Sequence, residues 1–374
     1  MDKKLKPHEI LADENNITCI CPDTNCLWHG HCRDCVALHR YHATIPSCLE
    51  IEIKNKKDIN IDHINAVFKN RIKEGITMRF YNPYKGLNNP NANWQKTNFH
   101  IHAGVEKDDL CGIHPIADVV KAYEDAGYNA IAITNHDLYV PHNIESEMEL
   151  IDGVEYSMDF HTLLIGHNRD DFPNMGHQEI IDYTLEQGGI AVLAHPSYRG
   201  HDYWKNEYMD SLKGYVGIEV VRAPKRNPAA YNGENGFSVE KWDWLLSRGH
   251  RVYGLGNDDL HYIEHVDGGF TMIYAKSAKF DDLKEAINAG CFYASTGVEL
   301  ESYNLDENTI KAKAKPKQSA DFTYRFIGAG GKLLKQSIGA EAEYTITTPE
   351  KYVRVEVISS ENEAMFLQPV FLED

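Results

Sequence analysis

The sequence lacks any hydrophobic run near the length of about 20 residues that a membrane-spanning helix needs. The opening segment MDKKLKPHEILADENN has neither the apolar core nor the cleavage site of a secretory signal. Basic side chains are also scarce: 38 Lys and Arg face 56 Asp and Glu, for a net charge of −18. Such a surface repels nucleic acid and anionic membranes. We therefore expect a cytoplasmic protein that binds neither.

Cysteine is scarce outside one short segment, because six of the eight cysteines fall between Cys19 and Cys48. Without an export signal, such a cluster predicts metal binding before disulfides. Thiolates and the interleaved histidines suit tetrahedral zinc, and so short a module cannot fold on apolar burial alone. Redox chemistry and a reduced, metal-free module are the alternatives. For a structural zinc in residues 1–50, the first candidate ligands are Cys21, Cys26, Cys32 and Cys35.

Short apolar segments and amphipathic segments alternate from residue 98 onward. This alternation is typical of a buried parallel sheet with helices outside it. No glycine-rich phosphate loop follows the first strand, and the units are too numerous for an open nucleotide-binding fold. We therefore predict an α/β barrel at residues 98–297, with its chemistry at the carboxyl ends of the strands. Helices are expected at 116–126, 178–186, 239–247 and 281–289, and strands at 129–134, 190–194, 216–221, 251–255, 270–274 and 291–294.

The segments on either side of this barrel have different patterns. Residues 51–97 form a connector with one short amphipathic helix at 61–73 and an Asn-, Pro- and Gly-rich stretch after it. Residues 298–374 alternate with a period of two between turn residues, which predicts a small antiparallel β-sandwich.

The expected strand ends carry a repeated set of metal-ligating side chains. His100 and His102 point the same way, because side chains alternate between the faces of a strand. One such histidine pair is weak evidence, since most single histidines are hydrogen-bonded core or surface residues. Five coincident strand ends instead favour a site for two or three divalent ions such as zinc, iron or manganese. The candidate ligands are His100, His102, His136, Glu155, His161, His195, Asp259 and His261.

The motifs NFHIHAG, ITNHD, GVE…H, GGIAVLAHP and DDLH, in this order, resemble those of the PHP (polymerase and histidinol phosphatase) family. The resemblance implies a distorted seven-stranded (β/α)7 TIM-like barrel, known as the PHP fold, that hydrolyses phosphate esters at a bi- or trinuclear metal centre. The segments WDWLLSRG, FYASTG and YVRVEV resemble a bacterial branch of the family with a C-terminal β-sandwich.

The resemblance also implies a role for each candidate ligand. His100, His102, Glu155 and Asp259 would hold one ion. Glu155 would bridge to a second ion, completed by His161 and His195, whereas His136 and His261 would belong to a third. Glu155, His195 and Asp259 would then be central to catalysis, and Asp258 would orient a ligating histidine.

Two departures from the family pattern affect the third ion. Asn98 stands where the family usually has Asp, and the next motif, Ser-Asp-Gly, is missing. Cys111 falls where the Asp of that motif belongs. Asp109 is the tentative replacement ligand, and Asp108 and His114 are alternatives. The sequence is therefore compatible with either two or three ions.

Two adjacent divalent ions lower the pKa of a bridging water and clamp the attacking and leaving oxygens of an in-line displacement. Arg199 and Arg222 follow strand ends and are candidates to bind phosphate, since a guanidinium can form a bidentate fork. The leading hypothesis is a phosphoesterase in which a metal-bridged hydroxide hydrolyses a small phosphorylated molecule. The alternatives are a metal-dependent hydrolase of a non-phosphate bond and a non-catalytic sensor or interaction protein that uses the cysteine-rich module. The sequence does not indicate an oligomeric state.

Overall fold

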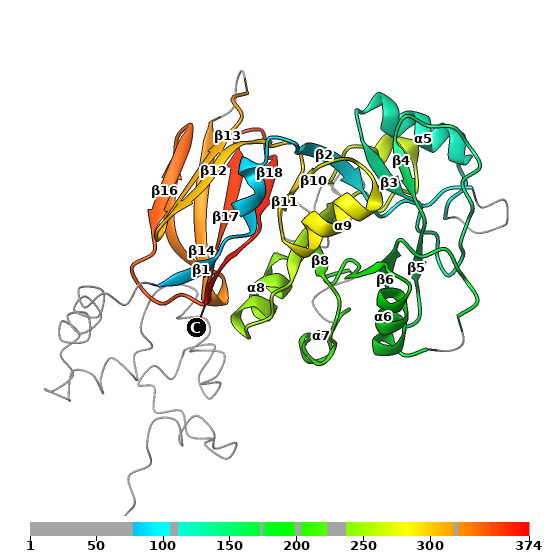
Figure 1. Ribbon diagram of the computed structural model, residues 1–374, viewed down its shortest axis with the longest axis horizontal. Coiled ribbons are helices and arrows are strands. Elements are labelled where there is room, and N and C mark those ends of the chain that lie inside the picture. Colours follow the sequence, from blue (N-terminus) through cyan, green and yellow to red (C-terminus); the bar gives the residue numbers. More distant parts are fainter. Residues whose placement is uncertain are drawn as a thin grey trace, which may run out of the picture. The chain divides into compact units, whose positions relative to one another are not determined.

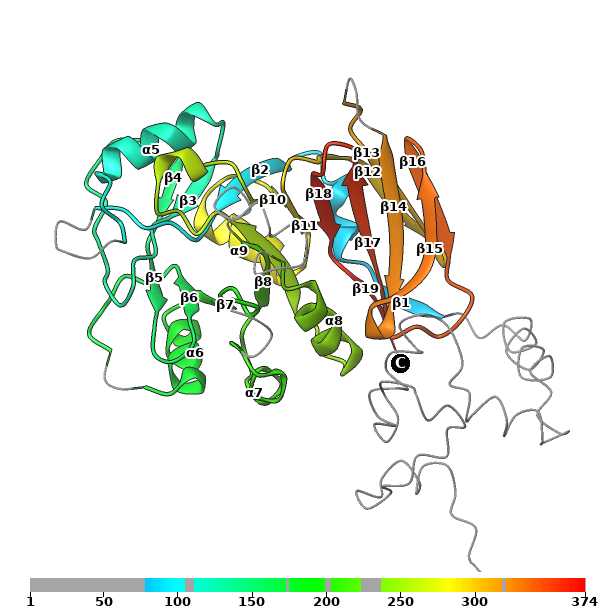
Figure 2. The ribbon, with the colours of Figure 1, turned by 180° about the vertical axis from the view of Figure 1, so that it is seen from behind.

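A computed structural model describes residues 78–104, 111–172, 175–198, 203–222, 237–317 and 321–373. The expected N-terminal zinc module with Cys21, Cys26, Cys32 and Cys35, and the expected helix at 61–73, lie outside the described residues. No helix in the described ranges is long and apolar enough to cross a membrane. The described chain is a mixed α/β structure in which strands clearly outnumber helices (Figures 1 and 2).

A five-stranded sheet carries half of the expected barrel strands. Its strands, in spatial order, are β5 (Gly153–Tyr156), β6 (Thr162–Ile165), β7 (Ile190–Leu193), β8 (Gly217–Arg222) and β9 (Tyr253–Asn257). Strands β7, β8 and β9 are parallel, whereas β6 runs antiparallel to both of its neighbours. Nearly every residue of these strands is buried, which explains their continuous apolar sequences. The helices between them are α6 (His177–Glu186), α7 (Asn206–Ser211) and α8 (Val239–Ser247).

A larger, 11-stranded sheet contains the other strands of residues 93–295. These are β2 (Asn93–Asn98), β3 (Ala130–Ala132), β4 (Glu149–Ile151), β10 (Phe270–Ala275) and β11 (Phe292–Ser295). Strands β2, β3 and β4 are parallel, and β10 lies antiparallel between β2 and β11. The connecting helices are α5 (Ile116–Asp125), between β2 and β3, and α9 (Phe280–Asn288), between β10 and β11.

Two isolated parallel bridges join these sheets near their strand ends, between Ile101 and Leu260 and between His136 and Glu155. The His102 amide donates to the Leu260 carbonyl at 3.0 Å, and the Asp137 amide donates to the Glu155 carbonyl at 2.9 Å. Strand ends from both sheets therefore meet at one place. The regular (β/α)7 barrel itself stays a prediction, because antiparallel strands interrupt the series and helices are few.

The C-terminal residues form antiparallel strands, as expected from their period of two. One three-stranded sheet consists of β12 (Leu300–Asp306), β13 (Thr309–Ala314) and β16 (Glu341–Thr345). The other strands extend the 11-stranded sheet. They are β1 (Arg79–Tyr81), β14 (Phe322–Gly328), β15 (Lys332–Ile338), β17 (Tyr352–Ser359), β18 (Ala364–Leu367) and β19 (Val370–Glu373). Short 3-10 helices lie at Pro83–Asn88, Ile263–His265 and Ala329–Gly331.

The helix predictions are confirmed, because each of the four expected helices begins and ends within one residue of the expected position. The prediction of parallel strands at 270–274 and 291–294 is wrong. Strand β10 pairs with β2 and β11, and β11 pairs with β10 and with the C-terminal strand β18. All of these pairs are antiparallel. The expected connector also contains strand β2, which ends at Asn98. The domain boundaries remain predictions.

Candidate metal centre

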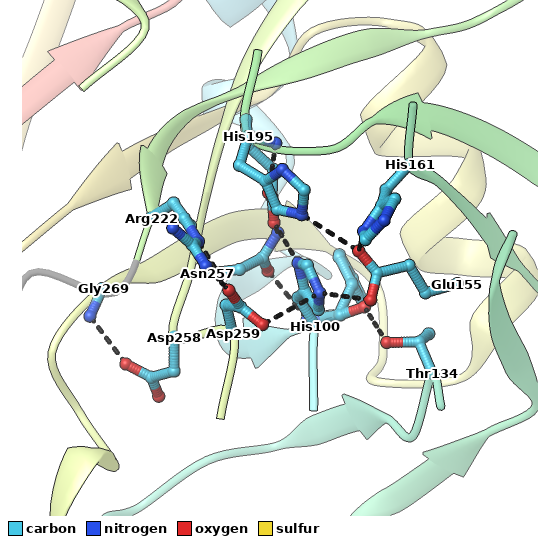
Figure 3. A network of polar contacts seen from close by, with 12 residues as sticks. His100, Thr134, Glu155, His161, His195, Arg222, Asn257, Asp258, Asp259 and Gly269 are labelled. Carbon is cyan, nitrogen blue, oxygen red and sulfur yellow. Dashed lines mark hydrogen bonds and ion pairs between the residues drawn. The ribbon is translucent and has the colours of Figure 1, made fainter. Parts of the chain in front are cut away.

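The eight principal predicted ligands lie at one cluster, supplied by strands from both sheets. Figure 3 labels five of them, His100, Glu155, His161, His195 and Asp259. His100 and His102 follow β2, and the intervening Ile101 is fully buried in the core, which turns both imidazoles toward the cluster. Glu155 lies within β5. The remaining members follow β3, precede β6, follow β7 and follow β9; they are His136, His161, His195, Asp259 and His261.

Glu155 is the centre of this cluster, and its carboxylate is fully buried. Each of its two oxygens faces a different group of imidazole nitrogens. Oε2 lies 3.1 Å from His100 Nε2, 3.3 Å from His102 Nε2 and 3.0 Å from His136 Nδ1. Oε1 lies 2.8 Å from His161 Nδ1 and 3.0 Å from His195 Nε2. One carboxylate thus reaches five imidazoles, as a ligand shared between ions would.

Asp259, which follows β9, faces two of the imidazoles that Glu155 faces, and His261 as well. Its Oδ1 lies 3.2 Å from both His100 Nε2 and His102 Nε2, and 3.5 Å from His261 Nδ1. Its Oδ2 accepts a hydrogen bond from Arg222 Nε. Asp259 therefore directs Oδ1 at the histidines, while Oδ2 is held by the Arg222 guanidinium.

The ligand atoms fall into four overlapping groups that can bind metal ions, and within each group they lie within 4.8 Å of one another. Four residues, His100, His102, His136 and Glu155, each belong to two of the groups, and the expected set of Glu155, His161 and His195 is divided between two groups. The groups are His100–His102–Asp259, His100–Glu155–His195, His136–Glu155–His161 and His102–His136–His261.

Buried polar atoms in the cluster fit a cation. His100 Nε2 and Glu155 Oε2 are buried, and neither forms a hydrogen bond of good geometry within the described residues. Such atoms are costly to bury without a partner. Glu155, Glu219 and Asp259 place three carboxylates around His100, and the guanidinium that pairs with them in the described ranges is that of Arg222. A divalent ion would satisfy these atoms and neutralise the excess negative charge.

The electrostatics of the histidines lead to the same conclusion. Burial alone lowers the pKa of His100, but Glu155, Glu219 and Asp259 together raise it well above its ordinary value. Burial lowers the pKa of His102 to about 4, and it also lowers the pKa of His195. Burial raises the pKa of Glu155, but His100 and the other imidazoles outweigh it and hold that pKa well below the usual value. The negative charge attracts a proton to His100 that a metal ion would displace.

Two residues of the cluster have backbones in the left-handed region, which costs a non-glycine residue about 1–2 kcal/mol. These are His195, with φ of 31°, and Asp259, with φ of 47°. The His195 amide donates to Glu219 Oε2 at 2.7 Å, which helps to hold that conformation. Strain of this kind persists where the surroundings fix the backbone, and it is common at functional sites.

Glu219 is the buried residue that the sequence interpretation missed. It lies in β8 and contacts His100 Nδ1 at 2.8 Å. The available signal was a single acidic residue in the otherwise apolar segment GIEVV.

Asp258 does not orient a histidine, contrary to the expectation. Its carboxylate accepts hydrogen bonds from Asn98 Nδ2, the Tyr123 hydroxyl and the backbone amides of residues 267–269. Asn98, which departs from the family pattern, is therefore a neutral donor to this buried carboxylate.

Arg222 is not a freely solvated cation, since its side chain is only 11% exposed, pairs with Asp259 and lies with its guanidinium 4.5 Å from the Tyr198 ring centroid. His114 belongs to none of the ligand groups in the described ranges. The other candidates, Asp108, Asp109 and Arg199, lie outside the described residues.

No protein-family model and no curated protein matches this chain. Among solved structures, it is similar to a two-domain protein of Bacteroides vulgatus described as containing a predicted PHP-like metal-dependent phosphoesterase. Sequence identity is 16%, the match covers 72% of this chain and 91% of that one, and the TM-score is 0.44. PsfC from Pseudomonas syringae is similar at 13% identity over 48% of this chain and 82% of that one, with a TM-score of 0.36. Both similarities are too distant to transfer a function.

Proposed function

We propose that this chain is a metal-dependent phosphoesterase that hydrolyses a small phosphorylated molecule. The observation that carries the proposal is the contact of one buried carboxylate, Glu155, with five imidazoles from four separate strand ends. A carboxylate in that position suits a bridge between ions, and the motif order of the sequence resembles a family that uses such a bridge.

The proposed ligand sets follow the two oxygens of Glu155, since Oε2 faces His100 and His102 whereas Oε1 faces His161 and His195. His100, His102 and Asp259 would hold one ion together with Glu155. His161 and His195 would hold a second with the other oxygen of Glu155. His136 and His261 would take part in a third, if one is bound. We propose zinc, manganese or iron, because imidazole and carboxylate ligands together suit these ions.

Divalent ions at such a site activate a water molecule and offset the negative charge that develops on a phosphate ester. The protein itself would position the ester. His136 and His161 have side chains 26% and 21% exposed, whereas those of His100 and His102 are fully buried. We therefore place the approach of the substrate at the side of His136 and His161. Arg222 would add a cation near Asp259.

Phosphate release tests the proposal. Full-length protein loaded with zinc, manganese or iron should release inorganic phosphate from some members of a panel of nucleotides and sugar phosphates. Glu155→Gln should lower kcat/KM by more than about 1000-fold, because members of one catalytic unit are individually indispensable. The matched control is His250→Ala, since His250 pairs with Asp210 and belongs to none of the ligand groups described above.

The count of bound ions completes this test. Elemental analysis should show at least two more ions in the wild type than in Glu155→Gln, a difference that excludes ions bound elsewhere on the chain. A smaller difference would contradict an enzyme of this kind. Metal-loaded protein that cleaves amides but no phosphate ester would contradict the phosphoesterase and favour a different hydrolase.

A further inference from the structure

Glu219 is a fully buried carboxylate outside the proposed ligand sets. It lies in β8 between Ile218 and Val220, which are also fully buried. A buried carboxylate is strongly destabilising unless hydrogen bonds or charges compensate it. Its position therefore has to be explained by the groups that it contacts.

The two oxygens of Glu219 hold three donors from three other strand ends. Oε1 lies 2.8 Å from His100 Nδ1 and accepts from Asn257 Nδ2 at 2.9 Å. Oε2 accepts from the His195 backbone amide at 2.7 Å. Asn257 is held in turn, since its Oδ1 accepts from the Phe99 amide at 2.8 Å. Glu219 thus links β8 with the segments that follow β2 and β7, and with β9.

The contact with His100 determines which ring nitrogen can bind an ion. An ionised carboxylate can only accept a hydrogen bond, so His100 Nδ1 must carry the proton. The lone pair of the neutral ring is then on Nε2. That atom lies 3.1 Å from Glu155 Oε2 and 3.2 Å from Asp259 Oδ1. Glu219 therefore selects the tautomer and the ring orientation that direct a ligand atom into the cluster.

The contact with His195 acts on a backbone instead of a ring. His195 has φ of 31°, which is unfavourable for a residue with a side chain. Its amide points at Glu219 Oε2, while its Nε2 lies 3.0 Å from Glu155 Oε1. A single carboxylate thus fixes histidines that lie on opposite oxygens of Glu155.

We propose that Glu219 is a positioning residue shared by two neighbouring ion sites, one using His100 and the other His195. The inference rests on the metal binding within the proposed function, but it does not depend on the substrate. It predicts that one substitution outside the ligand sets weakens ion binding at both sites together. A residue that only filled the core would not have this effect.

Glu219→Gln is the direct test. Glutamine offers one acceptor oxygen and one amino group, so the amino group must face either the His195 amide or the His100 and Asn257 donors. Affinity for two zinc ions, measured by competition with a chelator, should fall about 10- to 100-fold, as for other partners of metal ligands. The visible spectrum of the cobalt-substituted protein should change as well, because the geometry of the ligands relaxes.

The matched control is Glu356→Gln, which removes another buried carboxylate by the same chemical change. Glu356 lies in β17 and pairs with Arg354 and Arg325, so its loss tests destabilisation without touching the cluster. The control should keep wild-type zinc affinity and the wild-type cobalt spectrum. Equal losses in both variants would overturn the inference, because they would show a general effect of stability.

The inference and the proposed function fail in different ways. Wild-type affinity and spectrum in a folded Glu219→Gln variant would overturn the role of Glu219, whatever the protein hydrolyses. Tight zinc binding that depends on Glu219 without any phosphatase activity would support that role and contradict the proposed function. If Glu219→Gln does not fold, Glu219→Asp keeps the charge but shortens the side chain. Weakened zinc affinity in that variant supports the inference, and unchanged affinity overturns it.

Discussion

Asp258 and Asp259 are adjacent in the sequence, but their surroundings affect their ionisation in opposite directions. Burial raises the pKa of both carboxyl groups. For Asp259, Arg222 and the neighbouring histidines outweigh burial and hold the pKa well below its usual value. For Asp258 burial prevails, and the pKa is raised to about 6 despite hydrogen bonds from backbone amides and Tyr123. The residue that faces the cluster thus stays ionised, while its neighbour takes up a proton as the pH falls through about 6.

The pH dependence of stability tests this difference. The folded pKa of Asp258 lies above its ordinary value of 3.8, so the folded state holds this proton more tightly than the unfolded state. The stabilisation that this proton gives the folded state is present below about pH 4 and is lost as the pH rises through about 6. In chelator-treated protein, the unfolding free energy of the wild type relative to Asp258→Asn should therefore fall by up to about 3 kcal/mol between pH 4 and 7. Urea denaturation of both proteins measures this difference, and a constant value would contradict the prediction.

At the scale of elements, helix α8 is held to strand β17 by a buried polar network. Arg354 in β17 donates to both carboxylate oxygens of Asp243 in α8, from Nε at 2.7 Å and from a second guanidinium nitrogen at 2.6 Å. The Tyr352 hydroxyl donates to Asp243 Oδ1 at 2.6 Å. This network connects a helix of the expected barrel with a strand of the expected sandwich. It therefore ties the two regions together through charge as well as through apolar contact.

A double-mutant cycle should reveal this coupling. Arg354→Met leaves the buried Asp243 without its cation, so it should lower the unfolding free energy by about 3–5 kcal/mol. Asp243→Asn should lower it by less, because Arg354 keeps its pair with Glu356. The double variant should lose less stability than the two single variants together. The difference, which is the coupling energy, should be about 1–3 kcal/mol. Guanidinium denaturation gives all four values. Losses that add to within about 0.5 kcal/mol would show that the pair does not act as a unit.

The sequence could predict the helices of this protein better than the directions of its strands. The apolar period of helix α8 marks both of its ends, and its expected bounds agree with those observed. Strands β6, β10 and β11 have apolar sequences like those of their parallel neighbours, because burial on both faces leaves the same pattern in either direction. Their antiparallel pairing depends on the partner strands, which the local sequence does not specify.

The candidate site shows the same limit. The eight described ligands could be predicted because each stands at the end of an apolar strand, where side chains converge. Glu219 could not, since its role comes from contacts across to His100, His195 and Asn257. The expected role of Asp258 was wrong for the same reason, because its partners are backbone amides of a loop that lies close only after folding.

At the scale of the whole described region, the expected barrel and sandwich share one sheet. Strand β11 pairs with β18, which places strands from both sides of residue 297 next to each other. Tyr84, which the sequence placed in the connector, is buried between them. Its hydroxyl donates to the Phe292 carbonyl at 2.7 Å and accepts from the Gln368 amide at 2.8 Å. The shared sheet means that disturbance of one region is transmitted to the other, so that ion binding should stabilise the described region as a unit.

Metal removal tests this cooperative stabilisation. The chain carries a net charge of −18, and the carboxylates of the cluster repel one another when no cation lies between them. Ions that bind only the folded state stabilise it by about 2.7 kcal/mol at a free concentration of 100 times Kd. Treatment with a chelator should therefore lower Tm by roughly 5 °C in calorimetry, and added zinc should restore it.

The same measurement on Glu155→Gln separates the cluster from other ion sites on the chain. Without the shared carboxylate, the cluster should bind too weakly to respond to the chelator, so any shift that persists in this variant comes from ions bound elsewhere, such as in the cysteine-rich segment. The difference between the two shifts measures the stabilisation due to the cluster alone. Because that stabilisation reaches the sandwich strands through β11 and β18, wild-type protein should unfold in one transition with ions and without them. Equal shifts in both proteins would contradict metal binding at Glu155, and a separate transition for the C-terminal strands would contradict the shared cooperative unit.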